Sequence, residues 1–125
     1  MNERKSTSTN YLNESFMEAR CVLNRVLKIL GKRWIPEILL SIEEKGVQRF
    51  STLKEVLQGI SDQMLANCLA ELVQQELVEK KVLQEAPMRA TYSLTPSGSL
   101  IVVHLHALCH WGRNNLKIEK PGKAV

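Results

Sequence analysis

The stretch GISDQMLANCLAEL, residues 59–72, decides how this chain is interpreted. After the turn at Gly59, Ser61 is suited to cap a helix, because its hydroxyl can accept a hydrogen bond from the first helical turn. The apolar positions that follow recur at helical spacing and form one narrow stripe: Leu65, Leu69 and Leu72. The opposite side is mostly polar and carries no Lys or Arg; it consists of Gln63, Asn67, Ala70 and Gln74. Met64 lies at its flank. The pattern predicts an amphipathic helix with an outer face of amides rather than cations.

Two longer helices are predicted upstream. The first begins at Asn13 and ends near Gly31, and apolar residues recur along it in three- and four-residue steps. The second begins near Trp34, tolerates a proline in its first turn and ends at Gly46. The apolar positions of the first helix are Phe16, Ala19, Val22, Leu23, Val26, Leu27 and Leu30.

Shorter elements lie on either side of the opening stretch. VQRF, residues 47–50, predicts a short extended piece, after which Ser51 caps a third, short helix. Downstream, LVEKKVL (77–83) and ATYSL (90–94) alternate like strands and predict an antiparallel hairpin joined by QEAPMR (84–89).

A last helix closes the chain. Thr95 followed by Pro96 is a favourable helix start, and the helix runs to about Asn115. Its apolar stripe is Leu100, Val103, His104, Ala107, Leu108 and Trp111. The three helices between Trp34 and Leu72, the hairpin and the closing helix predict a mainly α (α+β) fold, the winged helix-turn-helix, with the two-stranded hairpin as its wing. The domain is expected over 13–116, with flexible tails at 1–12 and 117–125.

Composition restricts the class of protein. The chain has 125 residues and a formal net charge of +4, which suggests an anionic partner without establishing one. Its three cysteines are widely spaced and include no CxxC pair, which disfavours a disulfide framework or zinc cluster and favours a reducing compartment. The N-terminus has no signal-peptide core and no aliphatic run is long enough to cross a membrane, so we expect a cytoplasmic protein without a membrane partner.

Several motifs together carry a family resemblance. Five motifs carry it: GKRWIPEILLSI (31–42), RF (49–50), GIS with ML (59–65), YSLT (92–95) and HWG (110–112). Together they strongly resemble the HxlR-type bacterial transcription regulators, over roughly Cys21 to Gly112. The resemblance implies a homodimer that binds double-stranded operator DNA, often beside genes of redox or electrophile stress. It also implies that the terminal helices form the dimer interface and that the wings flank the recognition helices.

The chain departs from the family pattern at several positions. Cys21 is followed by Val22 where the family usually has proline, and Thr91 stands where an acidic residue commonly precedes the wing tyrosine. Family recognition helices often carry Lys or Arg near positions 63 and 68, which here are Gln63 and Cys68. These departures bear on thiol sensing and on the operator sequence.

Two sets of residues are candidates for DNA contact. The exposed N-terminal half of the second helix of this motif faces base edges, and amides suit adenine, so the base-reading candidates are Ser61, Gln63, Met64 and Asn67. These residues are alternatively the solvated face of a structural helix. Phosphate contacts can come from other elements, and the basic residues expected around the helix are Arg33, Arg49, Lys54, Lys80, Lys81 and Arg89. Of these, Arg89 matches the family's wing arginine.

The terminal helices carry the remaining candidates. Ile101, Leu105 and Cys109 lie beside the main stripe of the last helix, so we expect the excess apolar surface to pack against a second copy. The expected dimer contacts are Phe16, Leu23, Leu100, Val103, His104, Leu108 and Trp111. Cys21 is either a redox thiol, favoured by the nearby Arg20 and Arg25, or a packed one.

No cofactor or metal is expected. His106 and His110 lie one helical turn apart, but no nearby carboxylate completes a metal site, and surface or interface histidines are the alternative. No phosphate loop, nucleophile elbow or carboxylate pair indicates an enzyme. The competing hypothesis for function is a winged-helix protein-interaction module that has lost operator binding, to which the absence of Lys and Arg from the recognition helix would be the clue.

Overall fold

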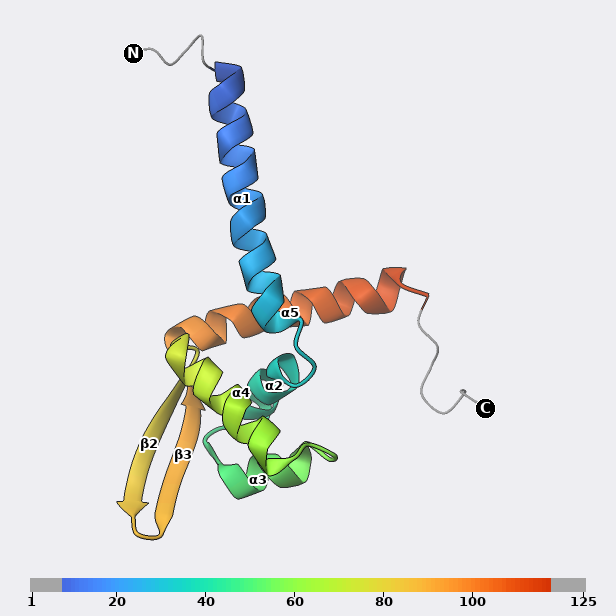
Figure 1. The fold of residues 1–125 in the computed structure, drawn as a ribbon. Helices are drawn as coiled ribbons and strands as arrows, with labels where there is room; N and C mark the ends of the chain where they lie inside the picture. Colours follow the sequence, from blue (N-terminus) through green and yellow to red (C-terminus); the bar gives the residue numbers. More distant parts are fainter. Residues whose placement is uncertain (1–7, 118–125) are drawn as a thin grey trace. The chain divides into compact units, whose positions relative to one another are not determined.

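The computed structural model describes residues 8–117, with the side chains from Phe16 onward. The chain divides into two compact units after Arg33. The first unit contains a single described helix, α1 (Ser8–Leu30) (Figure 1). It begins upstream of the predicted start at Asn13, so the expected N-terminal tail is already helical from Ser8. Residues 8–12 contain neither proline nor glycine, and extending an existing helix adds one hydrogen bond per residue. Residues 118–125 of the expected C-terminal tail lie outside the described part of the chain.

The second unit contains the remaining helices, which are α2 (Ile35–Lys45), α3 (Phe50–Val56), α4 (Asp62–Gln74) and α5 (Pro96–Asn115). The starts of α2, α4 and α5 agree closely with the sequence pattern. Ser61 caps α4 as predicted, since its Oγ accepts a hydrogen bond from the Met64 N–H at 3.0 Å. Thr95 caps α5 in the same way, accepting from the Gly98 N–H at 2.9 Å. The start of α3 was predicted wrongly: Arg49 is the extended N-cap residue, and the helix begins before Ser51.

The sheet has one strand more than the hairpin predicted from sequence. β2 (Val78–Glu85) and β3 (Met88–Leu94) form the wing, and their turn is only Ala86 and Pro87. β1 (Gln48–Arg49), expected only as an extended piece, pairs antiparallel with β3, which gives the order β1-β3-β2. The winged helix-turn-helix class is confirmed, with a three-stranded sheet at its base. Within this unit, the tip of the hairpin extends past α3 in Figure 1.

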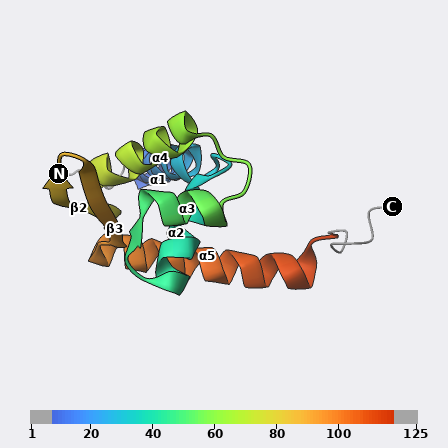
Figure 2. The same cartoon turned by 90° about the horizontal axis from the view of Figure 1, so that it is seen from below.

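A single aliphatic core holds this unit together. Helix α2 contacts α3, α5 and β3, while α4 contacts α3 and β2. Seen from below, α4, α3, α2 and α5 follow one another across the unit (Figure 2). The fully buried side chains come from each of α2, α3, α4 and β2: Ile35, Ile38, Leu39, Leu53, Leu65, Leu69, Leu72 and Val78. The predicted leucine stripe of α4 is therefore its core face, and burial of that face directs the amide side outward.

Helix α5 divides its apolar residues between two faces. Val102 and Leu105 are buried together with Gly98 and Gly112. The stripe identified from sequence is exposed in the single chain, including Leu100, Val103, His104, Leu108 and Trp111. The face of α5 that supplies the core is thus the one that the sequence pattern indicated as secondary. Within residues 8–117, no helix is both long and apolar enough to cross a membrane.

Candidate nucleic-acid interface

The first turns of α4 present amides in a defined arrangement. Ser61, Gln63, Met64 and Asn67 are all exposed, as the base-reading hypothesis requires. The Gln63 Nε2 donates a hydrogen bond to the Asn67 Oδ1 at 2.9 Å, one helical turn away. This bond orients both amides and leaves the Gln63 carbonyl as an acceptor and the Asn67 amino group as a donor. One acceptor and one donor are what the N6 and N7 edge of adenine requires. Ser61 has a structural task as well, because its Oγ caps the helix.

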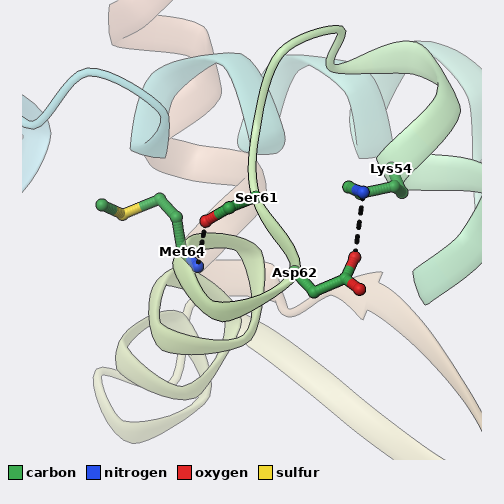
Figure 3. Close-up of polar contacts among 4 residues, drawn as sticks. All are labelled: Lys54, Ser61, Asp62 and Met64. Atoms are coloured by element: carbon green, nitrogen blue, oxygen red, sulfur yellow. Dashed lines mark hydrogen bonds and ion pairs between the residues drawn. The ribbon is translucent and has the colours of Figure 1, made fainter.

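An ion pair joins α3 to the first turn of α4. The Lys54 Nζ lies 2.9 Å from the Asp62 Oδ1 (Figure 3). Asp62 is favourably placed, because a carboxylate near a helix N-terminus interacts with the unpaired N–H groups there. Its side chain is still 79% exposed, so it remains accessible to a ligand. Lys54, expected as a phosphate contact, is therefore partly neutralised by a residue that the sequence pattern did not assign to the site.

Removing the Asp62 charge should strengthen binding to DNA of any sequence. In Asp62→Asn, Lys54 is released to contact a phosphate, so the plot of log K against log salt should steepen by roughly 0.9 per subunit. Glu55→Gln is the matched control, since it removes one exposed negative charge next to Lys54 in sequence without breaking this ion pair. Fluorescence anisotropy over a salt series measures the DNA affinity of both variants. Weaker binding by Asp62→Asn would instead indicate that the carboxylate itself accepts a hydrogen bond from a base amine.

The strand register sorts the basic residues of the sheet. Arg49 and Lys81 both pair with Thr91, from the two sides of β3. Arg89 lies two residues before Thr91 on β3 and therefore shares its face, because strand side chains alternate. Lys80 pairs with the buried Tyr92 and lies on the opposite face. We call Arg49, Lys81 and Arg89 the basic face of the sheet.

The six predicted phosphate contacts thus have different surroundings. Three form the basic face, Lys54 pairs with Asp62, and Lys80 lines a pocket beside α4. Arg33 is exposed and belongs to the first unit together with α1. The sequence alone could have shown that Lys80 and Lys81 lie on opposite faces of the sheet, because neighbouring side chains of a strand alternate. It offered no local signal for Arg49, which joins this face only through the pairing of β1 with β3.

The thiols and histidines occupy distinct environments. Cys21 and Cys109 are exposed, whereas Cys68 on α4 is buried, with 6% of its surface exposed. One carboxylate does lie near a histidine, since the His106 Nε2 is 3.4 Å from the Glu43 Oε1 of α2. The His110 ring lies instead 3.1 Å from the Asn114 Nδ2. Among the described residues, no three His, Cys, Asp or Glu side chains are grouped to hold a metal ion.

In the second unit, α4 is the second helix of a helix-turn-helix formed with α3; it is capped, faces outward and lies beside the β2–β3 wing. DNA-binding helix-turn-helix proteins have this arrangement. The model of the HxlR-like helix-turn-helix family matches residues 29–120. The chain belongs to this family. It is a DNA-binding transcription regulator of the HxlR type.

Individual relatives agree with this assignment. The HTH-type transcriptional regulator YodB of Bacillus subtilis is 34% identical over 89 residues, which are 71% of this chain and 79% of that protein. The uncharacterized HTH-type transcriptional regulator YtfH of Escherichia coli is 35% identical over 97 residues, or 78% of this chain and 76% of its own. The solved structure of reduced YodB has a TM-score of 0.69 at 32% identity and covers 78% of this chain and 94% of that one. YodB has also been solved after diamide treatment and with quinone bound.

Proposed function

We propose that this HxlR-type regulator binds operator DNA as a homodimer, with α4 reading bases and the basic face of the sheet contacting phosphates. The observation that carries the proposal is the oriented pair of Gln63 and Asn67 on the exposed side of a capped α4. In this division of tasks the amides supply specificity, while Arg49, Lys81 and Arg89 supply charge. A regulator of this kind acts in the cytoplasm, where the operator lies.

Gel shifts with DNA from the neighbourhood of the protein's own gene test this proposal. We expect a specific complex that weakens as salt rises, since phosphate contacts release counterions. The preferred site should be an inverted repeat, because two-fold dimers place their recognition helices on half-sites about one helical turn apart or a multiple of it. Equal affinity for specific and scrambled DNA would contradict the proposal.

The exposed apolar stripe of α5 supports the dimer. Leu100, Val103, Leu108 and Trp111 are each more than half exposed in the single chain, while the opposite side of the helix packs into the core. Contiguous apolar surface of this kind usually marks an interaction site. Phe16 and Leu23 of α1 are also exposed and offer further apolar surface to a second copy.

A charge in this stripe should dissociate the dimer. Leu108→Glu places a carboxylate in the proposed interface, and we expect sedimentation velocity to show a monomer at micromolar concentration, with operator binding abolished. Leu83→Glu is the control, because Leu83 of the wing has nearly the same exposure, 58% against 60%, and lies outside α5. A Leu108→Glu protein that sediments like the wild type would contradict the placement of the dimer interface on this stripe.

Oxidant sensing by Cys21 is a further part of the proposal. Its support is the exposure of Cys21 and the kinship with YodB, which has been solved after treatment with diamide. Two thiols would join in a disulfide, and the diamide would take up their two hydrogens and two electrons.

We expect diamide to change the operator affinity of the wild type and to leave Cys21→Ser unresponsive. Mass spectrometry of the unreduced protein identifies the partner thiol. Cys109→Ser is the matched variant, since Cys109 is also exposed. A response that persists in Cys21→Ser and disappears in Cys109→Ser would assign sensing to Cys109.

A protein-interaction module is the second candidate function. The absence of Lys and Arg from α4, together with the neutralisation of Lys54 by Asp62, favours it. It predicts that the amide face of α4 binds another protein and that DNA affinity does not depend on sequence.

A further inference from the structure

A pocket of about 400 Å³ lies between the recognition helix and the sheet. Ala66 and Ala70 of α4 are among its lining residues, and their small side chains, about one turn apart, leave room between the helix and β2. Leu69 and Val73 contribute apolar surface from the same helix. The volume lies within the range of sites for small organic ligands.

The lining of the pocket combines two aromatic rings with one cation. Phe50, the first residue of α3, and Tyr92 of β3 supply the rings. Tyr92 is only 8% exposed, and burial raises its pKa above the ordinary value, so its phenol stays neutral and able to donate a hydrogen bond. Lys80 lies on the same face of the sheet as Tyr92 and is exposed. No carboxylate among the described residues is within ion-pair distance of it. Gln74 adds a polar amide.

We propose that this pocket binds a small aromatic carboxylate, with the ring against Phe50 and Tyr92 and the carboxylate paired with Lys80. The chemistry of the lining favours both parts of this ligand. An inorganic anion would leave the aromatic and aliphatic surface unfilled, and a neutral aromatic would form no ion pair with Lys80, whose exposed ammonium would stay hydrated. Fixing an apolar body with a few polar groups is the usual design of such sites.

The position of the pocket links the ligand to DNA binding, and this link rests on the proposed function. Ala66, Ala70 and Gln74 lie on the side of α4 that also carries Gln63 and Asn67. A ligand bound there forms an ion pair with Lys80 and lies beside the amides of Gln63 and Asn67. It therefore competes with the operator, and saturating ligand should lower operator affinity.

The direct test measures binding of 2-naphthoate to the full chain without DNA, so that failure of the operator assay would leave the result intact. We expect shifts of the Ala66 and Ala70 methyl signals in NMR spectra, and affinity at least tenfold above that for neutral 2-naphthalenemethanol. In Lys80→Met, which keeps the aliphatic stem, the two compounds should bind equally. Lys45→Met removes an exposed cation at the end of α2 and should retain the wild-type preference.

A second variant tests the cavity itself. Ala70→Leu fills the space, and naphthoate binding should disappear while the thermal unfolding midpoint shows that the protein is folded. No methyl shift at millimolar naphthoate, or equal affinity of the wild type for the acid and the alcohol, would overturn the site. Naphthoate binding that leaves operator affinity unchanged would overturn the competition with DNA.

Discussion

Gly98→Ala is expected to destabilise the winged-helix unit by about 3 kcal/mol, at the upper end of the usual cost of overpacking. A Cβ at this position would lie far inside the van der Waals contact distance of the Leu77 carbonyl oxygen, 3.1 Å from the Leu77 carbonyl carbon and 3.3 Å from the Leu94 Cδ2. The carbonyl cannot easily move, because it accepts the Thr95 N–H at 3.1 Å. The substitution would therefore force the first turn of α5 away from the start of the wing.

Gly112→Ala is the matched control, because both glycines are buried residues of α5. A Cβ at Gly112 would meet only the Leu116 Cδ1, at 3.6 Å, which is ordinary contact. Alanine there should be neutral or stabilise the helix by up to about 1 kcal/mol. Urea unfolding followed by circular dichroism compares the two variants. Similar stabilities would mean that helix propensity, rather than the close approach of α5 to Leu77, governs position 98.

The largest expected effect on DNA binding comes from removing the basic face. A protein with Arg49, Lys81 and Arg89 all changed to Ala should bind every sequence more weakly. The slope of log K against log salt should flatten by roughly 0.9 for each phosphate that the variant no longer neutralises. Arg89→Ala alone should flatten it by about one such step per subunit. A slope equal to that of the wild type would remove these residues from the interface.

Gln63→Ala should behave in the opposite way. The amide carries no charge, so the salt slope should stay nearly unchanged, while discrimination at one base pair per half-site falls by about 1–3 kcal/mol. Asn67→Ala should give a similar result, because each amide orients the other. Both are measured on specific and scrambled DNA over the same salt series. If both variants bind the specific site like the wild type, the amide face does not read bases, and the result favours the protein-interaction module.

Local patterns in the sequence determined most of the elements. A cap residue before a periodic stripe located the start of α4 and the start of α5 to within a residue, because capping and helical spacing both act over a single turn. The polar outer face of α4 was equally readable, since burying Leu65, Leu69 and Leu72 leaves only one side for Gln63 and Asn67. The family resemblance was confirmed for the same reason: its motifs are short segments whose residues lie close together in the chain.

Only the tertiary structure decided which of these residues act together. β1 joins the sheet through partners more than 40 positions away, and this pairing alone brings Arg49 onto the face of Lys81 and Arg89. Lys54 meets Asp62 across the turn between two helices. Val102 and Leu105 become the core face of α5 because α2 and β3 pack against that side. Such contacts depend on how separate elements pack, and a periodic pattern within one element carries no information about its neighbours.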